Sequence, residues 1–133
     1  MTAKAHVLIV DDDEAVRRSY SAILADGQCD AQTAPDGAQA LAAMEEQPYD
    51  VVLLDVRMPG PDGMSVLKTL KQRWPESEVV IITGYPTVES AKEAVRLGAY
   101  DYLAKPAWPD DIAGAARGAL RRKQYALRQK LAN

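Results

Sequence analysis

The chain has 133 residues with eight glycines and eight prolines, which suits one ordinary domain around one modest core. Apolar residues form 47% of the sequence but occur in short runs, far from the roughly 20 in a row that cross a bilayer. The first ten residues carry no secretory signal pattern, so a cytoplasmic protein without a membrane segment is expected. Cys29 is the single cysteine, which excludes an internal disulfide and a cysteine-based metal cluster.

The net charge of −3 is distributed unevenly along the chain. Residues 1–108 hold 17 acids and 10 bases, whereas residues 109–133 hold 2 acids and 6 bases. A basic C-terminal segment can indicate nucleic-acid binding, but no helix-turn-helix, zinc-finger or aromatic-studded sheet pattern accompanies it. A solvated helix face is the favoured interpretation, and no direct nucleic-acid contact by this chain is expected.

Five apolar runs of strand length alternate with segments of helical spacing. The strands are expected at residues 6–10, 29–33, 51–54, 79–83 and 100–104. The first, third and fourth are almost continuous valine, isoleucine and leucine, which is typical of strands covered on both faces in a parallel sheet. Gly27 and Gly98 are expected to end helices, and turns are expected at residues 36–37 and 61–63.

Five successive βα units of this kind predict an α/β fold. Because parallel strands require right-handed crossovers, the expected product is a doubly wound, five-stranded parallel sheet with helices on both faces. Binding sites in such folds lie at the carboxyl ends of the strands, so the chemistry of this chain is expected at that edge.

Acidic residues follow two of the expected strands. Asp11 and Asp12 come after the first strand, and Asp55 comes after the third. If these strands are neighbours, the three carboxylates converge and repel one another unless a cation neutralises them. Mg²⁺ fits best, because it binds carboxylates, backbone carbonyls, water and phosphate oxygens. The alternative for the aspartate run alone is an N-cap followed by charges that favour the first turn of a helix.

The last two strands also deliver polar groups to this edge. Thr83 ends the fourth strand and Lys105 follows the fifth. A hydroxyl, an ammonium group and a metal ion together form a phosphate-binding set. Either residue alone would usually be incidental, but packing does not explain why four strands place polar groups at one edge.

These residues lie in motifs that resemble the successive signatures of response-regulator receivers of bacterial two-component systems. The motifs are Val10–Asp13, Leu54–Gly60, Ile82–Gly84 and Lys105–Pro106, and the resemblance covers residues 6 to about 122. It implies a flavodoxin-like fold with strand order 2-1-3-4-5. It also implies a phosphoacceptor switch rather than a metabolic enzyme, one that catalyses its own phosphorylation and a slow autodephosphorylation.

The resemblance further implies a role for each acidic residue of the site. Asp55 would attack the phosphorus of a phosphohistidine on a sensor histidine kinase and become an acyl phosphate. Asp12 and Asp55 would bind Mg²⁺ directly, Asp11 through a water molecule, and Arg57 through its backbone carbonyl. The expected partner is therefore a sensor kinase, and the expected cofactor is Mg²⁺.

The resemblance also implies how the signal leaves the site. Thr83 and Lys105 would hold phosphoryl oxygens, and the hydroxyl of Thr83 would report that phosphate has arrived. Tyr102 would be the aromatic residue that turns inward and relays the change to the face formed by the fourth helix, the fifth strand and the fifth helix. Simple packing on the sheet edge is the alternative for Tyr102.

The finer resemblance is to receivers that precede enhancer-binding, ATPase-type transcription activators. It rests on residues 55–60, 83–87 and 98–106, and no such ATPase is present in this sequence. The pair Ala107-Trp108 departs from the phenylalanine and capping residue that such receivers commonly have. The last helix is therefore expected to begin at Pro109 without the usual cap.

The sequence disfavours three other functions. A phosphatase of the haloacid dehalogenase type would use Asp11 and Asp13, but Ala15 stands where that motif needs threonine or valine, and Asp55 would be idle. A flavodoxin is disfavoured because an acidic loop after the first strand would repel the phosphate of the flavin. A receiver-like scaffold that is never phosphorylated conflicts with the intact set of polar residues.

The C-terminal residues are expected to continue the last helix beyond the domain. Residues 1–121 are expected to be the receiver domain, and residues 122–133 a helical extension, because from Pro109 to Leu131 no proline interrupts the helix after its first residue. The leucines at positions 120, 127 and 131 share one side, which is a short two-stranded coiled-coil pattern. A homodimer through this helix, or through the fourth helix, fifth strand and fifth helix, is expected; a frayed, solvated helix in a monomer is the alternative.

Overall fold

The computed structural model describes residues 4–27, 29–57 and 62–132. Five strands and five helices alternate along the chain. They are β1 (Ala5–Val10), α1 (Glu14–Asp26), β2 (Cys29–Ala34), α2 (Gly37–Glu46), β3 (Val51–Leu54), α3 (Gly63–Arg73), β4 (Glu78–Thr83), α4 (Val88–Arg96), β5 (Asp101–Ala104) and α5 (Pro109–Ala132). The strands form one parallel sheet in the order β2-β1-β3-β4-β5, which confirms the predicted fold and strand order.

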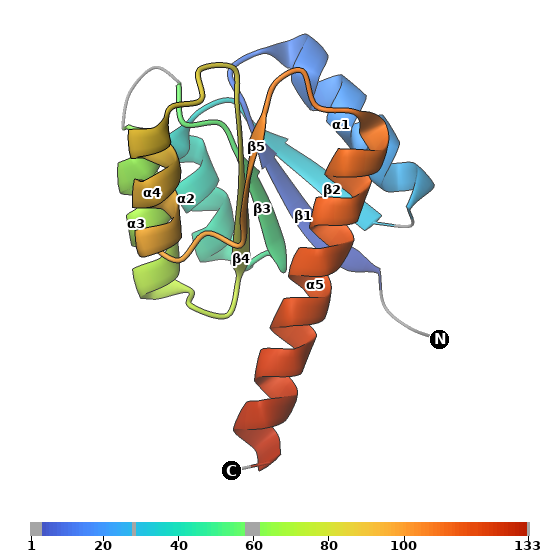
Figure 1. Ribbon diagram of the computed structural model, residues 1–133. Coiled ribbons are helices and arrows are strands. Elements are labelled where there is room, and N and C mark those ends of the chain that lie inside the picture. The colour runs from blue at the N-terminus through green and yellow to red at the C-terminus, as the bar shows by residue number, and fades with distance from the viewer. Residues whose placement is uncertain (1–3, 28, 58–61, 133) are drawn as a thin grey trace.

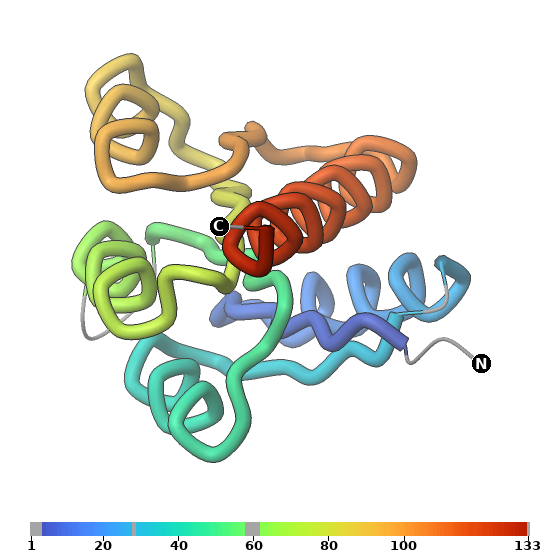
Figure 2. The backbone as a smooth tube through the Cα atoms, turned by 90° about the horizontal axis from the view of Figure 1, so that it is seen from below, coloured from blue at the N-terminus to red at the C-terminus, as the bar shows by residue number. Residues whose placement is uncertain are grey.

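The sheet lies between two layers of helices. Helices α1 and α5 cover one face, and α2, α3 and α4 cover the other (Figures 1 and 2). Because side chains alternate along a strand, Leu8 and Val10 of β1 pack under the three-helix layer, whereas Val7 and Ile9 pack under the two-helix layer. Strands β3 and β4 are buried along their whole length, as their continuous apolar runs predicted.

The predicted strand limits are correct to within one residue at each end. Four helices begin at a side chain that caps the first turn, contributed by Asp13, Asp36, Asp62 and Thr87. Gly27 follows α1, and Gly98 follows α4 with a φ of 95°, the left-handed conformation that favours glycine. Of the turn predicted at residues 61–63, Pro61 lies outside the described residues.

Helix α5 begins at Pro109, as predicted, and its last turns extend past the end of the sheet (Figure 1). None of the helices in the three described stretches is both long and apolar enough to cross a membrane. Leu120 packs partly buried against the core of the two-helix layer, whereas Leu131 is 88% exposed. The coiled coil therefore stays a prediction. Leu120 could contribute only the part of its side chain that the core leaves exposed.

The extension of α5 is tied to the amino-terminal ends of β3 and β4 by ion pairs. Lys123 pairs with Asp50, the residue before β3. Arg122 pairs with Glu78, the first residue of β4, at 3.1 Å. Burial alone would raise the pKa of Asp50, but hydrogen bonds from Lys123 and from His6 N lower it. The first turn beyond residue 121 is thus attached to the sheet.

Replacing Lys123 with methionine is expected to destabilise the protein by about 2 kcal/mol at neutral pH, the usual effect of losing a hydrogen bond to a charged group. Because the pKa of Asp50 is lowered in the folded state, this contribution is present at neutral pH and disappears as the pH falls through that pKa. Urea unfolding at neutral and at acidic pH measures both effects. Lys130→Met is the matched control, since its partner Glu76 is exposed and little should change. Equal losses in the two variants would contradict the prediction.

Candidate functional site

The site is built where β1 and β3 end side by side. Asp11 directly follows β1, and its backbone N–H donates to the carbonyl oxygen of Ala34 in β2 at 3.2 Å. Asp55 directly follows β3, and its N–H donates to the carbonyl oxygen of Val10 at 3.0 Å. The sheet pattern thus continues one residue past each strand, which fixes both carboxylates at the same edge.

Three carboxylates meet at this edge, as the sequence predicted. One oxygen from each of Asp11, Asp12 and Asp55 lies within 4.8 Å of the other two. Asp11 is 2% exposed and Asp55 is 6% exposed, whereas Asp12 is open to solvent. Like charges this close disfavour ionisation unless a cation lies among them. Three hard oxygen donors, with open space on one side, fit a Mg²⁺ ion that keeps part of its water.

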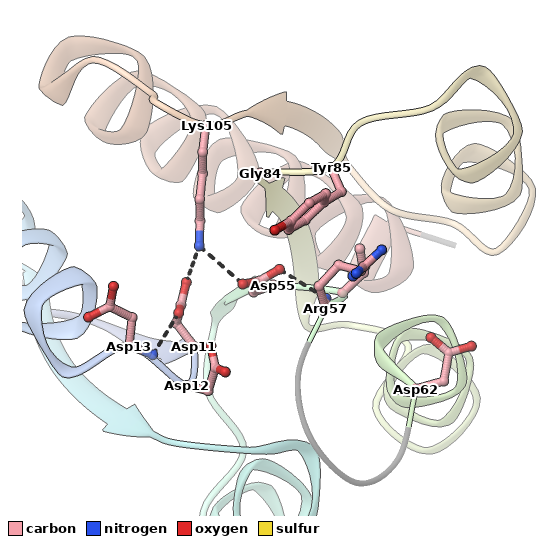
Figure 3. A pocket seen from close by; sticks show the side chains of 10 residues that line it. Asp11, Asp12, Asp13, Asp55, Arg57, Asp62, Gly84, Tyr85 and Lys105 are labelled. Carbon is pink, nitrogen blue, oxygen red and sulfur yellow. Dashed lines mark hydrogen bonds and ion pairs between the residues drawn. The ribbon is translucent and has the colours of Figure 1, made fainter.

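Lys105 follows β5 and bridges two of these carboxylates (Figure 3). Its Nζ donates to Asp11 Oδ2 at 2.5 Å and to Asp55 Oδ2 at 3.0 Å. The bond from Lys105 N to the carbonyl oxygen of Thr83, at 2.7 Å, holds its backbone beside β4, and the peptide bond to Pro106 is cis. The ammonium group therefore lies beside the carboxylate of Asp55, where it can pair with an anionic group bound there.

Burial and pairing act against each other on these groups. Burial raises the pKa of Asp55, and this outweighs the hydrogen bonds from Arg57 N and Lys105 that favour its ionised form. Burial also opposes the charge on Lys105, but its hydrogen bonds to Asp11 and Asp55 prevail and raise the pKa of the ammonium group. Lys105 thus stays protonated, while the ionised form of Asp55 is less stable than that of a carboxylate in water.

The carboxylates open into a cleft of about 710 Å³. Its lining also includes residues that the sequence interpretation did not assign to the site: Asp13, Val56, Asp62, Gly84 and Tyr85. Arg57 lies at the rim with its guanidinium carbon 4.1 Å from the centre of the Tyr85 ring, while its N–H donates to Asp55 Oδ1 at 3.0 Å (Figure 3). Asp62 is recognisable in sequence as a helix cap, but its place in the cleft depends on how α3 packs.

Thr83 and Tyr102 lie near the site without lining the cleft. Thr83 ends β4 at 0% exposure, and its hydroxyl oxygen accepts a hydrogen bond from Tyr85 N at 3.1 Å. Tyr102 is half-buried in β5 and directs its hydroxyl to Ser90 and Thr87 at the start of α4. The structure therefore brings together Asp11, Asp12, Asp55, Arg57 and Lys105, and leaves the two expected relay residues outside the lining of the cleft.

This arrangement supports one kind of chemistry best. Asp55 offers a carboxylate oxygen as a nucleophile, Lys105 offers a positive charge beside it, and the clustered carboxylates suit a divalent cation. An incoming group rich in negative oxygens would satisfy both cations. A phosphoryl group has that character.

The comparisons with known proteins agree with the fold. The profile of the response regulator receiver domain family matches residues 7–117, so the chain belongs to this family. It is a receiver domain of the type found in two-component response regulators, similar to those of NtrX-like and NtrC-like regulators.

Individual relatives support the same class. A putative NtrX-like response regulator of Rickettsia bellii is 42% identical over 102 residues, which are 75% of this chain and 21% of the relative. The DNA-binding transcriptional regulator NtrC of Escherichia coli K12 is 41% identical over 100 residues, again 75% of this chain and 21% of the relative. The crystal structure of the receiver domain of NtrX from Brucella abortus superposes with a TM-score of 0.82 at 37% identity, covering 86% of this chain and 98% of that one. The chain thus spans about a fifth of the length of these curated relatives.

Proposed function

We propose that Asp55 is the phosphoacceptor of a signalling switch and that the donor is a phosphohistidine on a sensor histidine kinase. A carboxylate oxygen of Asp55 attacks the phosphorus, the P–N bond breaks, and the imidazole nitrogen keeps the electron pair and takes up a proton. The observation that carries the proposal is the position of Asp55, buried between Lys105 and the other carboxylates at the floor of an open cleft.

Receiver domains typically bind Mg²⁺ in an acidic pocket, and the donor set of this chain fits that ion. We propose that Asp12 and Asp55 contact it directly, Asp11 through water, and Arg57 through its carbonyl oxygen. The ion would supply positive charge next to the phosphoryl oxygens. The residues of the chain orient the acceptor: the N–H of Arg57 and the ammonium group of Lys105 each hold one oxygen of Asp55.

We further propose that Thr83 and Tyr102 pass the signal onward. Thr83 lies at the end of β4, next to Lys105 across the β4–β5 pair, so its hydroxyl needs only a local movement to reach a phosphoryl oxygen. Tyr102 already contacts α4. The receiving surface would be the α4–β5–α5 face, where the large side chains of Val95 and Trp108 are exposed.

The role of the whole protein is a proposal as well, because the relatives are several times longer than this chain. We propose that it is a cytoplasmic receiver that controls an enhancer-binding ATPase-type activator, and that residues 122–133 form a connector beyond the receiver domain proper. Self-association through the α4–β5–α5 face or through the C-terminal part of α5 stays a prediction. Its support is the exposed apolar side chains on those elements, including Leu131.

Incubation with acetyl phosphate and Mg²⁺, followed by intact-mass measurement, tests the proposed function. A single covalent phosphoryl adduct is expected, decaying slowly after the donor is removed. The same incubation in EDTA should be strongly slowed, because clustered carboxylates and an incoming phosphate cannot otherwise be neutralised. A chain that stays unmodified in Mg²⁺ would refute the phosphoacceptor role, and an undiminished rate in EDTA would refute the role of the metal.

A further inference from the structure

The hydroxyl of Tyr102 joins β5 to the N-terminus of α4. It accepts a hydrogen bond from Thr87 N at 3.3 Å and shares a short hydrogen bond with Ser90 Oγ. Ser90 Oγ also lies 3.2 Å from the carbonyl oxygen of Thr87, and in its bond with Tyr102 either hydroxyl can be the donor. Thr87, Ser90 and Tyr102 together form what we call the hydroxyl cluster.

Ser90 is the centre of the hydroxyl cluster. Its N–H donates to Thr87 Oγ1 at 3.0 Å, and its Oγ accepts from Thr87 N at 3.3 Å, so the two residues form a capping box at the start of α4. The same Oγ lies 2.9 Å from Thr87 Oγ1 and shares a hydrogen bond with the Tyr102 hydroxyl. Removing one hydroxyl would therefore disrupt both the cap of the helix and its tie to β5.

Helix α4 has little else to hold it at this end. Ala94 is its single buried residue, while Val88 and Val95 are each 72% exposed. An element that buries so little apolar surface changes position at low free energy. The hydroxyl cluster is thus a main attachment of the N-terminus of α4.

The segment that connects β4 to α4 is attached at its other end by Thr83, whose Oγ1 accepts the bond from Tyr85 N. Under the proposed function, a phosphoryl group on Asp55 draws the Thr83 hydroxyl toward the cleft, and Tyr85 N loses this acceptor. The segment is then released at Thr83 while the hydroxyl cluster still holds it at Thr87. Phosphorylation thus removes one of the two attachments, and the other still opposes movement of α4.

We propose that the hydroxyl cluster is a latch that holds α4 in its unphosphorylated position, and that Ser90 is the positioning residue that sets how easily the latch opens. The proposal rests on the proposed function, since it concerns the regulation of the same site. If the open latch is the state that accepts the phosphoryl group, raising its population in advance raises the rate of labelling in proportion. Ser90→Ala should weaken the latch, and a net loss equivalent to one hydrogen bond should speed labelling by about two- to tenfold.

Two substitutions at Ser90 and one elsewhere test the latch. Ser90→Ala removes the hydroxyl, whereas Ser90→Thr retains one and should restore the behaviour of the wild type. Ser65→Ala is the matched control, because Ser65 occupies the third position of α3 as Ser90 does that of α4, and it accepts from Thr69 through its carbonyl rather than its hydroxyl. For each variant, amide chemical shifts of α4 and β5 are recorded before and after acetyl phosphate with Mg²⁺, together with the initial rate of labelling.

The expected result is that the unphosphorylated Ser90→Ala spectrum moves along the line that joins the two wild-type states, with faster labelling, and that Ser90→Thr returns both toward wild type. Shifts and rates equal to those of Ser65→Ala would overturn the latch. So would Ser90→Ala shifts that leave this line, because they would show a distorted helix and not a shifted equilibrium. A wild-type chain that forms no adduct would instead refute the proposed function, so the two failures are distinguishable.

Discussion

Replacing Asp55 with asparagine is expected to abolish phosphoryl labelling of this chain by acetyl phosphate and Mg²⁺. The amide has the shape of the carboxylate but no nucleophilic oxygen anion, so the covalent bond to phosphorus cannot form. Its carbonyl oxygen can still accept from Arg57 N, and Lys105 keeps its ion pair with Asp11. Intact-mass measurement over a time course records the loss of the adduct.

This loss should not come from unfolding. Burial raises the pKa of Asp55, so the ionised side chain is less stable in the folded protein than in water, and asparagine removes that penalty. The melting temperature of Asp55→Asn should therefore equal or exceed that of the wild type. Asp13→Asn is the matched control in the same cleft, because asparagine caps α1 as well as aspartate does, and it should label normally. A full adduct on Asp55→Asn would remove Asp55 as the acceptor.

Replacing Gly63 with alanine is expected to destabilise the fold by about 3 kcal/mol, the upper part of the range for overpacking a fitted interior. A Cβ at this position would collide with Val56 Cα and lie 2.9 Å from the carbonyl carbon of Val56. These are backbone atoms, which cannot rotate away as the end of a side chain can. Either the start of α3 or the segment after β3 must shift.

Gly114→Ala provides the contrast for the same change in α5. Its added Cβ would meet only the end of the Arg117 side chain, at 3.9 Å, and alanine favours a helix by about 1 kcal/mol over glycine. Urea unfolding of both variants should give opposite shifts of the midpoint at similar slopes. Because Arg57 lies one residue after Val56, Gly63→Ala should also weaken Mg²⁺ binding. A Gly63→Ala protein as stable as the wild type would show that the contact relaxes freely.

Much of the fold was predictable because its signals are local. Continuous apolar runs identified the buried strands. Polar residues directly after strands, among them Asp11, Asp55 and Lys105, lie at the carboxyl edge of the sheet. Strand pairing then placed these residues together, since parallel strands end at one edge. Boundaries were uncertain by one residue, because the last pair of a strand depends on its neighbour. The strand β2, for example, ends at Ala34, one residue later than expected, because an alanine at a strand end does not by itself indicate a strand.

Local sequence patterns were thus enough to predict the α/β class, the meeting of Asp11, Asp12 and Asp55 at one edge of the sheet, and the beginning of α5 at Pro109. They could not determine contacts between side chains far apart in the chain. The two bonds of Lys105, the pairing of Lys123 with Asp50 and the bond between Tyr102 and Ser90 each join different parts of the chain. Such contacts depend on how the layers pack, because a one-residue rotation of a helix would direct each side chain elsewhere. Only the tertiary structure decided them.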